Sequence, residues 1–158
     1  MTDEPPWYEQ IAMPALLRHA RSTYGNAMRR ALAEAGYEDV PRNGLYVIGG
    51  MAMGAAGVPL SQLVRELGIS KQAAGQLVDT LVLRGYLERT VDPDDRRRLT
   101  VTLTERGKAA AAAQTAAREA IDDALLERIG DKAILATRRT LAALIGIGQD
   151  KRTEPEEH

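Results

Sequence analysis

The sequence lacks cysteine entirely, and no segment approaches the roughly 18 consecutive apolar residues that a membrane-spanning helix needs. Without cysteine, disulfides, thiolate metal sites and thiol-based redox sensing are excluded. The first residues, MTDEPPWYEQ, are acidic and contain two prolines, unlike the apolar centre of a secretory signal. We therefore expect a cytoplasmic protein that makes no contact with a membrane.

Histidine is almost absent as well, which disfavours an enzyme. The two copies are His19, in a helical stretch between arginines, and the terminal His158. The glycines at 49–50 and 54–57 lack the spacing of Walker or dinucleotide-binding loops, and no metal-ligand spacing occurs. We expect neither catalysis nor a cofactor nor a metal site.

The chain also has no surplus of charge of either sign. Its 21 Lys and Arg residues face 22 Asp and Glu residues, for a formal net charge of −1. Nucleic-acid-binding domains usually present a basic surface, so any such surface here must be local. The 158 residues, 44% hydrophobic and 27% charged, suit a single globular domain.

Apolar residues at helical spacing occupy both ends of the chain. Residues 14–35 predict one long helix with a proline in its first turn and a glycine at its end. Residues 43–53 predict a buried helix, which Gly49 and Gly50 either weaken or allow to pack closely.

The C-terminal third is also expected to be helical. The alanine-rich run 109–120 favours a helix that continues to Gly130, and Asp131 is a suitable N-cap for a last helix. Residues 149–158 are polar, and we expect them to be disordered.

The middle of the chain has a different organisation. Residues 60–67 and 71–84 predict two short helices joined by a tight turn that contains a glycine. Alternating apolar residues then predict strands near 87–91 and 99–103, joined by the charged tip 92–98. The fold class is therefore mostly α with a small β-hairpin wing, a winged helix-turn-helix with long terminal helices.

The domain organisation follows from this order of elements. We expect one domain over 1–158, in which 40–104 form the winged helix-turn-helix. The helices at 10–35 and 108–148 are expected to form a homodimer, because they are long relative to the winged part. Packing of the same faces within one chain is the alternative.

The second helix of the helix-turn-helix carries polar residues on its outward side, and such a helix can enter the major groove of DNA. Gln can pair with adenine and Lys can reach guanine. The residues expected to contact DNA from this helix are Ser70, Lys71, Gln72, Gly75 and Gln76. Gly75 either lets the backbone approach the groove floor or accommodates a packing neighbour.

The wing tip adds positive charge through Arg96, Arg97 and Arg98. Arginine favours the narrow minor groove of A·T-rich DNA, so we expect these residues to contact DNA. The tip carboxylates of 92–95 are expected to pair with these arginines or with Arg89. A solvated, salt-bridged turn without a partner is the alternative.

Taken together, these segments resemble the multiple-antibiotic-resistance-regulator (MarR) family of winged-helix transcription factors over nearly the whole chain. The segments that carry the resemblance are Leu60-Ser61-Gln62-Leu63, Ile69-Ser70, Leu77-Val78-Asp79-Thr80-Leu81, Arg84-Gly85-Tyr86-Leu87, Asp92-Pro93-Asp94-Asp95-Arg96-Arg97 and Val101-Thr102-Leu103-Thr104-Glu105-Arg106-Gly107.

The resemblance implies specific roles. Lys71, Gln72 and Gln76 lie where family members read bases, and Arg96 and Arg97 lie where they enter the minor groove. Members are homodimers that bind pseudo-palindromic operators, usually as repressors. Many release DNA when a small aromatic or lipophilic anion binds.

Two further carboxylates are assigned to coupling between the wing and the reading helix. The resemblance places Asp79 where an acidic residue pairs with a wing arginine, and Asp95 of the tip is expected to help hold the wing in shape. The sequence departs from the family at Ala73 and Ala74, where hydroxyl residues are common.

An effector pocket is the other expectation, with Tyr24, Met28, Tyr46 and Met51 as candidate lining residues. Tyr and Met at helical spacing are also typical of a hydrophobic core. The sequence has one Trp, five Tyr and no Phe, so few rings could stack on a ligand. A winged-helix module that binds protein rather than DNA is the alternative function.

Overall fold

The structure, a computed structural model, describes residues 4–53, 60–92, 94–97 and 99–150. The expected loop at 54–59, Arg98 of the wing tip and most of the expected disordered tail (151–158) lie outside this range. The chain divides into two compact units, an N-terminal unit (Met1–Arg118) and a C-terminal unit (Glu119–His158).

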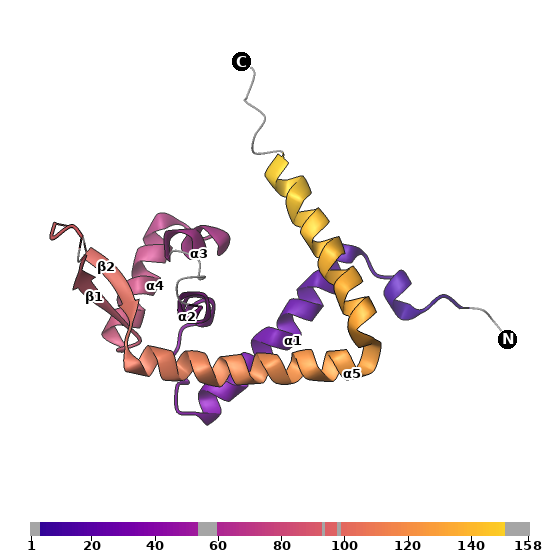
Figure 1. The fold of residues 1–158 in the computed structure, drawn as a ribbon, viewed down its shortest axis with the longest axis horizontal. Helices are drawn as coiled ribbons and strands as arrows, with labels where there is room; N and C mark the ends of the chain where they lie inside the picture. Colours follow the sequence, from indigo (N-terminus) through magenta and orange to yellow (C-terminus); the bar gives the residue numbers. More distant parts are fainter. Residues whose placement is uncertain (1–3, 54–59, 93, 98, 151–158) are drawn as a thin grey trace, which may run out of the picture. The chain divides into compact units, whose positions relative to one another are not determined.

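The described elements follow the predicted order (Figure 1). They are η1 (Trp7–Glu9), α1 (Met13–Glu34), α2 (Gly44–Ala52), α3 (Leu60–Glu66), α4 (Lys71–Leu83), β1 (Leu87–Val91), β2 (Leu99–Leu103) and α5 (Glu105–Asp150). The predicted fold class, mostly helical with one β-hairpin wing, is confirmed. In the described ranges, no helix combines the length and the apolar character needed to cross a membrane.

The hairpin is antiparallel and pairs Leu87 with Leu103 and Val91 with Leu99. The hydroxyls of Thr90 and Thr100 lie 3.0 Å apart across the two strands. A two-stranded hairpin is marginal by itself, and here β1 packs on α4 while β2 packs on α2 (Figure 1). The helices therefore hold the wing in place.

Local signals set the ends of α4. The Ser70 hydroxyl accepts a hydrogen bond from the Ala73 amide at 3.1 Å, which is the N-cap that the sequence predicts. Gly85 follows the helix with φ +75°, a backbone angle that favours glycine. These two signals fix where the predicted reading helix begins and ends.

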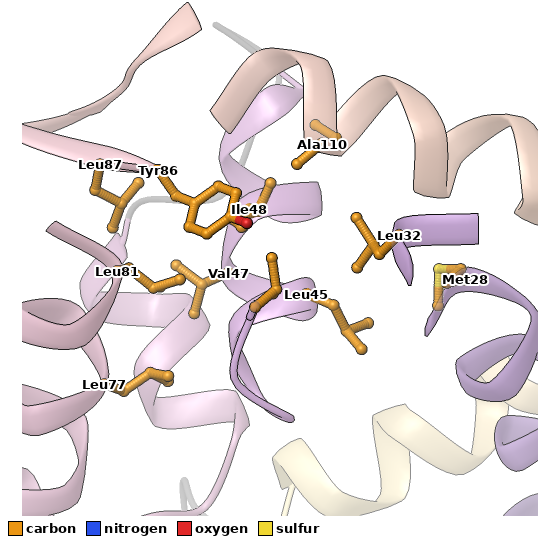
Figure 2. Packing of buried hydrophobic residues seen from close by; sticks show 12 residues of the cluster. Met28, Leu32, Leu45, Val47, Ile48, Leu77, Leu81, Tyr86, Leu87 and Ala110 are labelled. Carbon is orange, nitrogen blue, oxygen red and sulfur yellow. The ribbon is translucent and has the colours of Figure 1, made fainter. Parts of the chain in front are cut away.

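The core of the N-terminal unit joins residues from α1, α2, α4, β1 and α5 (Figure 2). Its largest fully buried side chains are Tyr86, Leu45, Ile48, Leu81, Leu87 and Val47. Burial of one such side chain contributes about 1.5–3 kcal/mol. Because α4 supplies Leu81 and β1 supplies Leu87, this core fixes α4 and the wing against each other.

Small residues let α5 approach its neighbours closely. Ala110 and Ala111 are buried, and a Cβ atom at Gly107 would overlap the backbone oxygen of Tyr86. On α2, a Cβ at Gly49 would overlap the Gln114 side chain, and one at Gly50 would overlap Leu63. The close-packing interpretation of the two α2 glycines is therefore supported.

The C-terminal unit consists of the rest of α5, which is interrupted at Gly130 (φ 77°, ψ 164°). This confirms the predicted helix end at Gly130 and a further helix after it. The helix continues through Asp150, so the expectation that disorder begins at Gln149 was wrong. Gly146 and Gly148 do not take the positive φ that would end the helix earlier.

Replacing Gly107 by alanine should lower the free energy of unfolding by about 1–3 kcal/mol, because the added methyl group must displace the backbone at Tyr86. Gly75→Ala in α4 is the matched control, since an added Cβ there meets nothing within 4 Å. It should raise the free energy of unfolding by about 0.4–1 kcal/mol. Urea unfolding at one protein concentration compares the two; equal stabilities would contradict the close contact.

Candidate nucleic-acid interface

One face of α4 is polar and exposed, while the opposite face is buried. Ala74, Leu77 and Leu81 point into the core. The side chains that the sequence assigned to DNA contact lie exposed, and they are Ser70, Lys71, Gln72, Gly75 and Gln76. The helical period therefore brings all five residues to solvent together, at the N-terminal part of one helix.

Gly75 lies in the middle of this exposed face. Apart from the chain neighbours of Gly75 and the nearby backbone of α4 itself, no heavy atom of the described residues lies within 4 Å of a Cβ added there. The interpretation that Gly75 accommodates a packing neighbour is therefore wrong for the described part of the chain. What remains is a strip of bare helix backbone that an outside surface can approach.

A groove of about 460 Å³ runs beside α4 and extends the exposed face. Its lining includes Gln76 and Thr80 of α4, Arg84 at the end of that helix, and Arg42 and Asn43 just before α2. The sequence reasoning missed Arg42, Asn43 and Arg84. In the sequence, Arg42 and Asn43 stand out only as polar residues directly before a buried helix, and Arg84 only as a basic residue directly after α4.

Asp79 of α4 and Arg89 of β1 form an ion pair that joins the helix to the wing. Both side chains are largely exposed, at 66% and 42%, so the pair contributes little to stability. Its effect is geometric: it holds the carboxylate and the guanidinium on the same side as the exposed face of α4.

The wing-tip carboxylates bind the backbone. The Oδ1 atom of Asp92 accepts from the Asp94 amide at 2.9 Å, and that of Asp95 accepts from the Arg97 amide at 3.0 Å. Within the described part of the tip, no carboxylate pairs with an arginine, so the expected pairing with Arg89, Arg96 or Arg97 was wrong. Short Asp side chains reach an amide two residues onward more readily than a long, solvated guanidinium.

This arrangement leaves Arg96 and Arg97 exposed, with no ion pair to any described residue. Arg98 lies outside the described residues. The guanidinium groups of Arg96 and Arg97 are therefore available to an outside partner, although the aspartates beside them keep their negative charge.

A cluster around Tyr86 anchors the wing to α5. The Tyr86 hydroxyl donates to Asp39 and accepts from Arg106 at 3.0 Å, and Arg106 also lies 3.2 Å from the Asp39 carboxylate. The Arg84 guanidinium donates to the Asp39 carbonyl. The loop before α2, the end of α4, the start of β1 and the start of α5 therefore meet at one point.

The charges of this cluster shift two pKa values in opposite directions. The Tyr86 hydrogen bond, with the nearby Arg106, lowers the pKa of Asp39 below its usual 3.8. Burial, with the hydrogen bond to Asp39, raises the pKa of Tyr86 to about 12. Both shifts favour the ionised carboxylate and the neutral phenol.

The four effector candidates do not form one site. Met28 is buried in the core, and Tyr24, Tyr46 and Met51 are partly buried against it. Met28 and Tyr46 line a hollow of about 450 Å³ between α1, α2 and α5, whereas Met51 lines a separate hollow with Leu103 and Lys108. The core interpretation therefore holds for Met28, and Tyr46 remains the clearest lining residue.

The sequence reasoning missed the polar groups of this 450 Å³ hollow, which are Gln114, Thr115 and Arg118 of α5. Gln114 is 4% exposed, and its Nε2 donates to the Leu45 carbonyl at 2.7 Å. Its Oε1 is buried and accepts no hydrogen bond from any described residue. An unsatisfied buried oxygen is costly and suits a site that receives a donor. No cluster of three or more metal-ligating side chains occurs among the described residues.

Asp39→Asn should make the free energy of unfolding depend less on pH in the acid range. A lowered pKa means that Asp39 stabilises the fold above its unfolded-state pKa, and that this contribution is lost as the pH falls through the folded-state value. The free energy of unfolding should therefore fall less in the variant than in the parent between about pH 5 and pH 2. Parallel profiles from denaturant titrations at a series of pH values would contradict the assignment.

Comparison with known proteins finds a family model that matches the middle of the chain. The model described as "MarR family" matches residues 39–98, from the loop before α2 to the wing tip. Comparison with curated protein sequences gives no match.

The chain is also similar to several solved structures. CouR from Rhodococcus jostii RHA1, bound to p-coumaroyl-CoA, is 27% identical, with 82% of this chain and 88% of that chain covered and a TM-score of 0.64. The S. aureus MepR–DNA complex shares the fold with a TM-score of 0.67; it is 16% identical, with 86% of this chain and 98% of that chain covered. Streptococcus pneumoniae FabT in complex with DNA also shares the fold, with a TM-score of 0.65; it is 19% identical, with 88% of this chain and 99% of that chain covered. Residues 39–98 of the chain thus match the MarR family model, and the chain shares its fold with these solved structures.

Proposed function

We propose that the protein is a sequence-specific DNA-binding repressor that binds a pseudo-palindromic operator as a homodimer and is released by a small-molecule effector. The observation that carries this proposal is the continuous exposed surface of α4 and the wing, tied together by the Asp79–Arg89 pair. Two structural neighbours, MepR and FabT, were solved in complex with DNA.

The reading residues are Lys71, Gln72 and Gln76, which lie exposed on the N-terminal half of α4. The major groove admits one helix, and a Gln side chain can bind adenine through two hydrogen bonds. The absence of any neighbour around Gly75 supports close approach of this helix to base edges.

Arg96 and Arg97 are assigned to the minor groove next to the reading helix. Their lack of ion pairs to described residues supports this role, because an unpaired guanidinium keeps its full attraction for the narrow, electronegative groove of A·T-rich DNA. A wing that binds protein would more often present an apolar surface, which disfavours the alternative of a protein-interaction module.

Exposed apolar residues support a homodimer. Those of the C-terminal unit are Leu125, Leu126, Ile129, Leu135, Leu144, Ile145 and Ile147, and those near the N-terminus are Trp7, Tyr8, Ile11 and Met13. Apolar area on this scale suits burial by a second copy. Two reading helices on a two-fold axis would then contact half-sites about one helical turn, roughly 10 base pairs, apart.

An effector is proposed for the hollow between α1, α2 and α5, whose lining is mainly apolar with one unsatisfied oxygen from Gln114. CouR, solved with p-coumaroyl-CoA, supports a ligand that has an aromatic part. We expect binding there to compete with DNA binding.

The deciding experiment is selection of bound duplexes from a random pool at two salt concentrations. We expect an inverted repeat whose affinity falls steeply as salt rises, because phosphate contacts release counterions. Gln72→Ala and Gln76→Ala should each lose about 1–3 kcal/mol at particular base pairs. Arg96→Ala and Arg97→Ala should weaken binding most at A·T-rich flanks; equal losses by all four on every sequence would contradict the division of roles.

Gly75→Ala provides a separate test of close approach, because it should leave the fold intact or stabilise it while lowering affinity for the selected operator. The measurement pairs urea unfolding with a fluorescence titration of labelled operator. An unchanged operator affinity would show that the backbone at Gly75 does not come close to DNA.

A further inference from the structure

Four arginines gather around one hollow on the N-terminal unit, apart from the wing tip and the exposed face of α4. The hollow, here called the arginine hollow, has a volume of about 330 Å³. Its lining residues lie on one face of α1, before and within α2, and just after α3. Its charged lining residues are Arg18, Arg21, Arg29 and Arg42.

The positive charge of this hollow is not neutralised within the described part of the chain. None of the four guanidinium groups has a carboxylate of a described residue within 4.0 Å. The Arg21 guanidinium instead lies 4.8 Å from the centre of the Tyr46 ring. Four like charges around one cavity repel one another, and an anion in the hollow would relieve that repulsion.

The number of donors indicates the kind of anion. A single carboxylate is satisfied by one forked arginine, whereas a phosphate group offers several charged oxygens and favours several guanidinium donors. Ser22, Asn26 and Asn43 add neutral hydrogen-bonding groups to the same lining. The set therefore fits a ligand part that carries more than one phosphate group.

The hollow of about 450 Å³ between α1, α2 and α5, which contains Gln114, is here called the effector hollow. Tyr46 connects it to the arginine hollow, since this side chain lines both of them. The effector hollow has a mainly apolar lining and contains the unsatisfied Gln114 oxygen. An apolar group with one hydrogen-bond donor would fit there, with its phosphorylated end on the other side of Tyr46.

We infer that the arginine hollow binds the phosphate groups of a two-part effector whose apolar end occupies the hollow beside Gln114. This inference rests on the proposed effector response and specifies its ligand class: an apolar group joined to a multiply phosphorylated carrier. The wing and α4 take no part in it.

DNA phosphate is the competing occupant, and one residue favours it. Arg42 also lines the groove beside α4, so it lies next to the reading helix. Arg18, Arg21 and Arg29 belong to α1 and do not line that groove. Three of the four charges are therefore placed for a ligand in the hollow rather than for the operator.

Calorimetric titration of the DNA-free protein tests the inference with three probes: tripolyphosphate, 4-hydroxybenzoate and 4-hydroxybenzoyl-coenzyme A. We expect the coenzyme A thioester to bind at least about 100-fold more tightly than 4-hydroxybenzoate, since several charge-assisted hydrogen bonds are added. Tripolyphosphate should bind weakly and compete with the thioester. Equal affinities of the thioester and 4-hydroxybenzoate would overturn the inference.

Arg29→Ala and Arg30→Ala form a matched pair of variants. Both residues are exposed on α1, but only Arg29 lines the arginine hollow. Arg29→Ala should weaken thioester binding about 10-fold or more and leave binding of 4-hydroxybenzoate unchanged, whereas Arg30→Ala should change neither. Equal effects of the two variants would contradict a specific site.

Two other measurements separate the remaining outcomes. If Arg29→Ala weakens operator binding without ligand and the thioester does not bind, the hollow contacts DNA and the inference fails. If Arg29→Ala lowers the dimer fraction in sedimentation at unchanged ligand affinity, the arginines pair across subunits and the inference also fails. Operator binding by the parent protein tests the proposed DNA-binding function independently of these results.

Discussion

The hydrogen bonds of the Tyr86 hydroxyl hold together the surface that is proposed to face DNA. The ring is fully buried, its hydroxyl bonds to Asp39 and Arg106, and the Arg106 guanidinium lies 4.6 Å from the ring centre. A buried hydroxyl without partners is costly, so the segments that carry these partners must arrive together. Strand β1 begins at the residue after Tyr86. The Tyr86 carbonyl also accepts a hydrogen bond from the Thr104 amide at 3.1 Å, just before α5. The wing, the end of α4 and the start of α5 thus share one anchor.

Given that anchor, weak surface interactions are enough to shape the proposed interface. The Asp79–Arg89 pair adds little stability at its exposure, but it joins two elements that the core already holds. At the wing tip, the carboxylates of Asp92 and Asp95 accept hydrogen bonds from backbone amides. The local turn is thereby stabilised without neutralising Arg96 and Arg97. A chain with a net charge of −1 can therefore keep two exposed guanidinium groups without ion pairs to described residues, because the neighbouring carboxylates accept hydrogen bonds from backbone amides.

Small residues decide how close the helices come, and the same residue type has opposite effects at different sites. Gly107 faces the Tyr86 backbone and leaves no room for a methyl group, whereas Gly75 faces open space. Gly49 and Gly50 bring α2 against Gln114 and Leu63. This close contact places the Gln114 side chain in the wall of the effector hollow, with Tyr46 between that hollow and the arginine hollow.

The sequence by itself determined the main helices, the β-hairpin and their order, because their signals are local. The Ser70 cap, the positive φ of Gly85 and the break at Gly130 each depend on a few neighbouring residues, and the outward face of α4 follows from the helical period. Family motifs supplied the link between Asp79 and the wing, which spacing alone did not show.

Only the tertiary structure decided which partners the charged and polar groups take. It paired Arg89 with Asp79 and gave Asp92 and Asp95 backbone partners. It also divided three of the four effector candidates between two hollows, and it gathered arginines from α1 and from just before α2 around a third hollow. Such choices depend on distances between segments far apart in the sequence. Those distances are set by how side chains fill the core, and no periodicity in the sequence encodes them.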